Sequence, residues 1–174
     1  TKLSKLLAMI EPFVRGWIAE MIGDRGGSSP DLGSLDLGKI IRIRSNTVDS
    51  FPGDNDGLDS ANDGASSGDV IILPPATFTS DITWTAGVKV IIWSRYATVL
   101  TGKIKGGAGA SMENLSLIRS ADSGDNLIGV SNPASGTFKV NDCDIEVTQA
   151  GAGDAYAASL DDNGNVEYWM CDLY

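Results

Sequence analysis

Short apolar runs separated by tight turns fill the chain after residue 47, and this pattern most constrains the fold. The runs alternate apolar and polar residues, as in Val88–Trp93 and Asp144–Thr148, and Gly, Asn, Asp, Ser or Pro divides them. No helical periodicity separates them, which excludes an alternating strand–helix fold. The sequence predicts a mainly β body over residues 39–174.

Several of these runs recur at a nearly constant spacing along the chain. Glu113–Leu117 aligns with Cys143–Val147 at an offset of 30, and Cys143–Ile145 aligns with Cys171–Leu173 at an offset of 28. Residues 124–129 align with residues 153–158 at an offset of 29. A repeat with a period near 29, made only of strands and turns, is typical of a solenoid, in which stacked coils bury a continuous core.

The repeat also predicts which side chains lie in the core. Cys171 would lie above Cys143 on the next coil, and Leu173 above Ile145, with alternation turning these residues and Val147 inward. Two cysteines form no disulfide framework, so we expect a buried pair of thiols with low reactivity. The predicted core residues are Cys143, Ile145, Val147, Cys171 and Leu173.

The start of the β body resembles a known superfold. Residues 68–78 read Gly-Asp-Val-Ile-Ile-Leu-Pro-Pro-Ala-Thr-Phe and follow an Asp-rich stretch that predicts a short helix capped by Asp56. This segment looks like the start of right-handed parallel β-helices of the pectin-lyase-like superfold, with Ala76 where glycine is usual. The resemblance covers residues 49–174 and implies a fold shared by pectate lyases, polygalacturonases, phage tailspikes and tail fibres.

The first 22 residues carry the periodicity of an amphipathic helix. Six apolar residues spaced four and three apart form the seam of a helical bundle, and other apolar residues widen this face. A lone helix of this kind exposes too much apolar surface, so it either self-associates or packs on its own chain. We expect a homo-oligomer, with a trimer as the preferred state, formed through Leu3, Leu7, Ile10, Val14, Trp17 and Met21.

Composition divides the chain into a helical anchor (1–22), a Gly/Ser/Pro linker (23–38) and the β body (39–174). Residues 1–48 carry seven basic and five acidic side chains, whereas residues 49–174 carry six basic and eighteen acidic ones. This acidic body disfavours binding to nucleic acid. No apolar run is long enough for insertion into a membrane or for a secretory signal.

Candidates for catalysis are few, because the chain has no histidine and lacks recognisable polysaccharide lyase or hydrolase motifs. The best are two outward carboxylates, Asp144 and Asp172, which form a predicted ladder with Asn114. Neighbouring strands lie about 4.8 Å apart, close to the carboxylate spacing of retaining glycosidases. The two aspartates could instead share a calcium ion, or simply be solvated. We expect solvated side chains, no turnover and no cofactor.

Two other patterns have weaker functional interpretations. Residues 54–57, Asp-Asn-Asp-Gly, have the composition of a calcium loop but not the ligand spacing of an EF-hand. Five aromatic residues are candidates for stacking against sugars, although burial in the core explains such residues equally well. They are Trp84, Trp93, Tyr96, Tyr168 and Trp169.

The order of anchor, linker and β body favours a structural or receptor-binding virion component, such as a phage tail fibre or tailspike. Its partners would be further copies of itself, other virion or surface-assembly proteins, and host-surface polysaccharide. Its location would be the virion tail or an extracellular surface. One alternative is a polysaccharide lyase or hydrolase of the pectin-lyase type, and another is an extracellular filament or adhesin. The helical seam favours the first over the enzyme, since secreted lyases are usually monomers without one.

Overall fold

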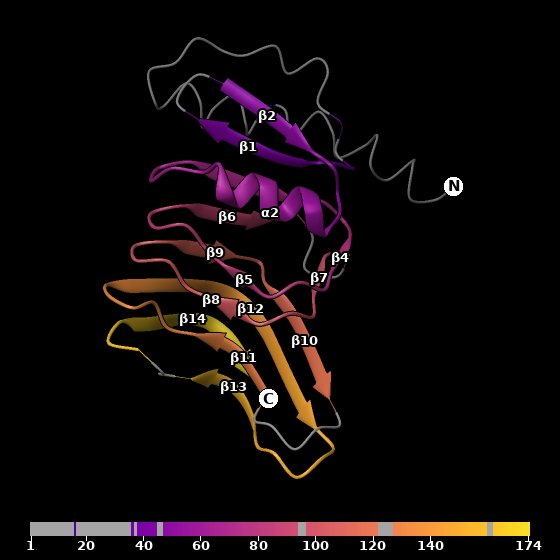
Figure 1. The fold of residues 1–174 in the computed structure, drawn as a ribbon, viewed down its shortest axis with the longest axis vertical. Helices are drawn as coiled ribbons and strands as arrows, with labels where there is room; N and C mark the ends of the chain where they lie inside the picture. The colour runs from indigo at the N-terminus through magenta and orange to yellow at the C-terminus, as the bar shows by residue number, and fades with distance from the viewer. Residues whose placement is uncertain are drawn as a thin grey trace.

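The computed structural model describes residues 16, 36, 38–44, 47–93, 97–121, 127–159 and 162–174. Within these ranges the chain is built of β-strands and one helix, α2 (Asn55–Asp63) (Figure 1). That helix is too short to cross a membrane, and no other helix of the described residues could do so. The strands are β1 (Ile40–Arg44), β2 (Thr47–Phe51), β3 (Val70–Leu73), β4 (Thr77–Phe78), β5 (Ile82–Thr83), β6 (Lys89–Ile92), β7 (Val99–Leu100), β8 (Ile104–Lys105), β9 (Ser111–Glu113), β10 (Ser116–Ala121), β11 (Leu127–Ser131), β12 (Thr137–Gln149), β13 (Ala155–Ser159) and β14 (Asn165–Leu173).

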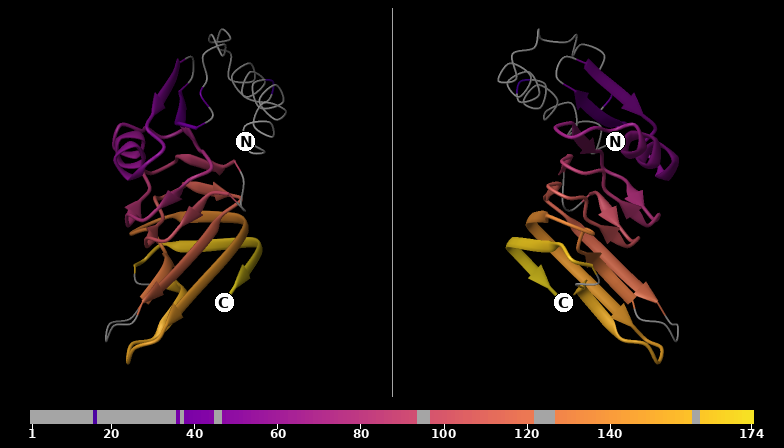
Figure 2. Two further views of the ribbon diagram at one scale, coloured as in Figure 1. Left: turned by 90° about the vertical axis from the view of Figure 1, so that its right-hand side faces the viewer. Right: turned by 60° about the vertical axis from the view of Figure 1, so that its left-hand side comes forward.

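The strands form two sheets that lie along the long axis of the molecule. The larger is a ten-stranded mixed sheet with the order β2-β1-β3-β6-β9-β12-β10-β7-β4, in which β14 also pairs with β12. The smaller is a four-stranded sheet with the order β13-β11-β8-β5, and its pairs are parallel. Figure 1 and Figure 2 show the larger sheet curling, with β1, β2 and α2 at one end of the molecule and, toward the other end, β14 of the larger sheet and β13 of the smaller sheet.

The predicted fold class is wrong, although the body is mainly β. We expected a right-handed parallel β-helix with a uniform coil period behind a helical segment. Instead the larger sheet is mixed, because β1 pairs antiparallel with both β2 and β3. The spacing of the parallel pairs also varies. Val70 pairs with Lys89, Lys89 with Ser111 and Ser111 with Lys139, so the spacing lengthens at each step along this series. Connections of unequal length therefore replace the single period.

The register at the second end of the sheet corrects two predicted offsets. Asp144 pairs with both Ser116 and Asp172, so the offset is 28 on each side, and the predicted 30 is wrong. Leu127 likewise pairs with Ala155 at an offset of 28 rather than 29. The predicted pairing of Cys143 with Cys171 is confirmed.

Backbone bends recur with this same spacing. Asn114, Asp142 and Met170 have φ values of 61°, 51° and 52°, in the left-handed region. Asn and Asp tolerate this region better than other non-glycine residues, because their short side chains can bond locally. The Asn114 side chain forms a backbone bond, donating from Nδ2 to the carbonyl of Ile92 at 3.3 Å. These bends let one long strand such as β12 run along two parts of the curled sheet.

The core lies between the two sheets and consists of rows of inward side chains, one from each paired strand. One row contains Phe78, Leu100, Leu117 and Ile145, each at most 2% exposed. Of the predicted core residues, Cys143, Ile145 and Val147 are buried and Cys171 is half-buried. Placing Leu173 with them was wrong, since it is 43% exposed. It extends the row beyond Ile145 and is covered by a strand on one side only among the described residues.

Helix α2 covers the core near β1. Asp54, rather than the predicted Asp56, caps it, because the Asp54 Oδ1 accepts a hydrogen bond from the Gly57 backbone N–H at 2.9 Å. Leu58 and Ala61 point into the core and are fully buried. A Cβ at Gly57 would overlap the Pro52 carbonyl oxygen, so this turn requires glycine.

Candidate functional site

The predicted acidic ladder is only partly formed. Asp144 and Asp172 are direct neighbours on β12 and β14. Asn114 is not in this row, because the observed register puts Ser116 beside Asp144. The Asn114 side chain instead bonds the backbone of Ile92. The row therefore holds two carboxylates and a hydroxyl.

No general base is brought to these two aspartates from the basic residues that the sequence places nearest. Arg119 donates from Nη1 to the Asp81 Oδ1 at 3.1 Å, beside another strand. Lys139 pairs with Glu167, with 3.7 Å between the Lys139 Nζ and the Glu167 Oε2. An elimination reaction requires a base beside the proton to be removed, and hydrolysis requires one protonated and one ionised carboxyl group. Asp144 and Asp172 are neighbours, while Arg119 and Lys139 each pair with another carboxylate.

The residues that resembled a calcium loop are used for structure. Asp54 caps α2, as described above, and Asn55 links this helix to the segment after β4. The Asn55 Nδ2 donates to the Thr79 hydroxyl at 2.8 Å, while its Oδ1 accepts from the Thr79 backbone N–H at 2.9 Å. Across the described ranges, no group of three or more His, Cys, Asp or Glu side chains is arranged to hold a metal ion.

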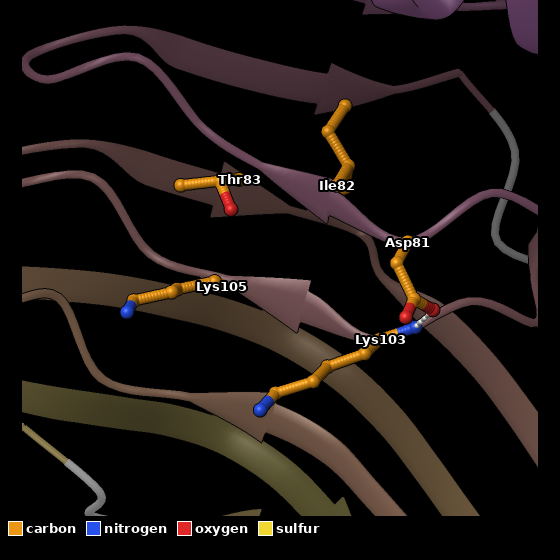
Figure 3. A pocket seen from close by; sticks show the side chains of 5 residues that line it. All are labelled: Asp81, Ile82, Thr83, Lys103 and Lys105. Atoms are coloured by element: carbon orange, nitrogen blue, oxygen red, sulfur yellow. Dashed lines mark hydrogen bonds between the residues drawn. The ribbon is translucent and has the colours of Figure 1, made fainter.

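A shallow groove of about 240 Å³ lies on the smaller sheet, where β5 and β8 run side by side. The Asp81 Oδ1 accepts a hydrogen bond from the Lys103 backbone N–H at 2.6 Å. The side chains of Lys103 and Lys105 extend in the same direction over the groove (Figure 3). The Lys105 Nζ also lies 2.5 Å from the Asp162 Oδ2. The groove therefore has lysines and carboxylates around it, and the apolar side chain of Ile82 also lines it.

The sequence contains a shorter repeat that indicates this groove, which the period near 29 residues does not include. Residues 77–83, Thr-Phe-Thr-Ser-Asp-Ile-Thr, align with residues 99–105, Val-Leu-Thr-Gly-Lys-Ile-Lys, at an offset of 22. The structure pairs these stretches in that register, with Phe78 beside Leu100 and Ile82 beside Ile104. An internal repeat of this length predicts that the polar positions Asp81 and Lys103 are neighbours.

The aromatic candidates for sugar stacking fall into different environments. Trp84 is in the core at 2% exposure, and Trp93 and Tyr168 are partly buried against apolar clusters. Tyr96 lies outside the described residues. Trp169 is 62% exposed on the outward face of β14. Of the candidates that the structure describes, Trp169 therefore offers the most open ring.

Trp169 stands in a row of outward polar side chains. Its neighbour on β12 is Asn141, and the next residue along the row is Glu113 on β9. A salt bridge of 2.9 Å joins the Glu113 Oε1 to the Lys89 Nζ. We call Glu113, Asn141 and Trp169 the outward row. It combines an exposed indole ring with an amide and a carboxylate, the groups that stack on and hydrogen-bond to polar ligands.

Further apolar side chains are exposed around the same end of the sheet. Met170 is 82% exposed and Tyr174 is 72% exposed. Tyr174 continues the main-chain pairing with β12, because its N–H donates to the Ile145 carbonyl and its own carbonyl accepts from Val147. The exposed apolar surface at this end therefore belongs to an ordered strand.

Cys143 and Cys171 form a disulfide, which corrects the expectation of two free thiols. Their in-register pairing brings the two Cα atoms to 4.5 Å, within the range that a disulfide spans. The bond joins β12 to β14 across a sequence separation of 28. The described part of the chain contains no free cysteine and so offers no thiol nucleophile there.

The predicted oligomerisation residues lie outside the described residues. Of the anchor and the linker, only residues 16, 36 and 38 are described. They are Leu3, Leu7, Ile10, Val14, Trp17 and Met21.

Comparison with protein-family models, with curated proteins and with solved structures finds no match to this chain.

Proposed function

We propose that the protein is a structural and receptor-binding component of a virion, such as a phage tail fibre or tailspike, with no catalytic turnover of its own. In this proposal it self-associates through residues 1–22, with a trimer as the expected state, and presents its outward strands to host-surface glycans. The observation that carries the proposal is the outward row of Glu113, Asn141 and Trp169.

The outward row supports recognition of a sugar because it combines two kinds of contact. The apolar face of a sugar ring stacks on an exposed aromatic ring such as that of Trp169, while its hydroxyl groups bond amides and carboxylates. The backbone that carries these groups is held in place, since β9, β12 and β14 pair in register. Side chains on a rigid scaffold bind with less loss of entropy than side chains on a mobile loop.

A polysaccharide lyase or hydrolase has less support. Its best carboxylates, Asp144 and Asp172, lie side by side, but Arg119 and Lys139 are engaged with Asp81 and Glu167. No other observation on the described residues favours catalysis over binding.

Binding is tested by titrating the full-length protein with a panel of neutral and acidic oligosaccharides, followed by NMR shifts of backbone amides. Trp169→Ala should weaken binding by about tenfold, the effect of losing one aromatic contact. Tyr174→Ala is the matched control, because Tyr174 is also an exposed aromatic residue but lies in a different row. Equal affinity of wild type and Trp169→Ala for every ligand would refute the role of the outward row.

Catalysis is tested by screening the same glycans for new reducing ends or unsaturated products. Wild type should release none. Turnover that disappears in both Asp144→Asn and Asp172→Asn would replace the proposal by the enzyme alternative. Self-association is tested separately by the mass of the full-length protein in solution, and a monomer would remove that part of the proposal.

A further inference from the structure

The sheet near β1 is buried on both of its faces. On β3, Ile71 and Leu73 point into the main core, while Val70 and Ile72 on the opposite face are 0% and 3% exposed. Val70 and Ile72 belong to a second apolar cluster, which we call the outer cluster. Its buried members are Ile41, Ile43, Val70, Ile72 and Ile91, with Val48 and Trp93 partly buried beside them.

Among the described residues, no apolar side chain from outside the sheet packs on this outer cluster. All its members belong to β1, β2, β3 and β6 or directly follow β6, so they lie in the sheet itself. Helix α2 is on the opposite face of β1. Arg42 points toward that helix and donates from Nη1 to the Ala61 carbonyl at 2.9 Å. Its sequence neighbours Ile41 and Ile43 point the other way, because side chains alternate along a strand.

A sheet whose strands are apolar and buried on both faces needs a layer over each face. Within this chain, a layer over the outer cluster would have to come from residues outside the described ranges. Four of those stretches, 45–46, 94–96, 122–126 and 160–161, are two to five residues long and mostly polar. Only the N-terminal part of the chain is long and apolar enough.

We infer that residues 1–22 pack on the outer cluster of their own chain. This segment is the most apolar part of residues 1–37, and the following residues 23–37 are interrupted by Gly, Ser and Pro. Those fifteen residues can span at most about 50 Å when extended. They lead to Gly38, shortly before the strand that carries Ile41 and Ile43. The linker is therefore long enough for the segment to reach the face that needs covering.

The same segment has enough apolar surface for this role and for self-association. With about 100° between successive residues of a helix, its apolar positions span roughly half of the circumference. Phe13 and Leu6 lie on one flank of the predicted seam, and Ile18 and Ile22 lie on the other. One part of the face can contact the sheet while another contacts a second copy. The inference does not depend on the proposed function, since a monomer would satisfy it equally.

The direct test is photo-crosslinking of the full-length protein with benzoylphenylalanine in place of Ser50. Ser50 is an exposed residue of β2 that pairs with Ile41. Mixing isotopically light and heavy copies distinguishes bonds within a chain from bonds between chains. We expect crosslinks to residues 1–22 within one chain. The same probe at Thr77, an exposed residue of β4, is the matched control and should give none.

The inference would be overturned if position 50 formed crosslinks only to residues 23–37. It would also be overturned if all crosslinks to residues 1–22 joined a light copy to a heavy copy, or if no crosslink to residues 1–37 formed. A second measurement uses hydrogen exchange on the full-length double variant Leu7→Lys, Val14→Lys. Amides of β1 and β3 should exchange faster by about tenfold, the effect of roughly 1.4 kcal/mol of lost local stability. Lys5→Ala, a change outside the apolar face of the predicted helix, should leave them unchanged. Unchanged exchange in the double variant would likewise refute the inference.

Discussion

Two residues of one inward row provide a stringent test of the register. Ile145 lies between Leu117 and Leu173 and is fully buried, whereas Leu173 at the end of the row is 43% exposed. Truncating a fully buried Ile to Ala removes its transfer free energy and leaves a cavity, which costs about 2–5 kcal/mol. The same truncation of a half-exposed Leu loses part of that transfer energy and leaves no closed cavity, so its cost is about 1 kcal/mol.

The measurements are urea and thermal unfolding of wild type, Ile145→Ala and Leu173→Ala, both followed by circular dichroism under identical redox conditions. In a chain of this length each loss of about 1 kcal/mol lowers Tm by about 2–4 °C, so heating should separate the two variants clearly. Ile145→Ala should lose about 1–4 kcal/mol more unfolding free energy than Leu173→Ala and should unfold at a correspondingly lower temperature. Equal losses of unfolding free energy in the two variants would show that Leu173 is as buried as Ile145, and the register and exposure argued above would then be wrong.

Three further predictions concern other contacts of the same sheets. Because Cys143 and Cys171 are bonded, iodoacetamide should label neither cysteine in native or urea-unfolded protein until a reductant is added; labelling on unfolding alone would show free thiols. A Cβ at Gly106 would overlap the Phe138 side chain, so Gly106→Ala should lower the unfolding free energy in urea by about 1–3 kcal/mol. Adding Phe138→Leu to this variant should recover part of the loss, whereas additive losses would show that the two residues are not in contact. Burial raises the pKa of the Tyr168 phenol above its ordinary value near 10, so the folded state favours the neutral form. The resulting contribution to stability is complete below about pH 10 and is lost as the pH rises above it. Tyr168→Phe should therefore reduce the fall in unfolding free energy at alkaline pH, and an unchanged fall would show that Tyr168 does not cause it.

The strands and the last pairings could be predicted because they depend on local pattern. Alternation around Ile145 predicted its inward direction, and the Cys-Asp spacing predicted the pairing of Cys143 with Cys171, which the register confirms. The uniform period could not be obtained in this way. The early turns have different connection lengths, so the spacing that relates Ile82 to Ile104 is shorter than the spacing that relates the two cysteines. A single spacing taken from the later repeats therefore does not predict the pairing of the earlier strands.

Other features depend on contacts that the sequence pattern does not specify. The antiparallel pairing of β1 with β3 brings Ile41 beside Ile72, across a long connection that includes helix α2. The bond between the cysteines depends on the short distance between their Cα atoms, which only the register determines. The sequence marks Trp169 as a candidate, but the pairing of β12 with β14 is what makes Asn141 its polar neighbour.

The distribution of burial along the larger sheet separates two roles. Near β1 both faces are closed, as Val70 on one side and Ile71 on the other show. At β12 and β14 only the inward face is closed, and the outward one carries Asn141 beside the exposed ring of Trp169. If residues 1–22 cover the outer cluster, the N-terminal end has no open apolar sheet face left for a receptor. Recognition is then confined to the outward strands at the other end, so changes to the anchor should alter stability and assembly without altering the affinity for a sugar.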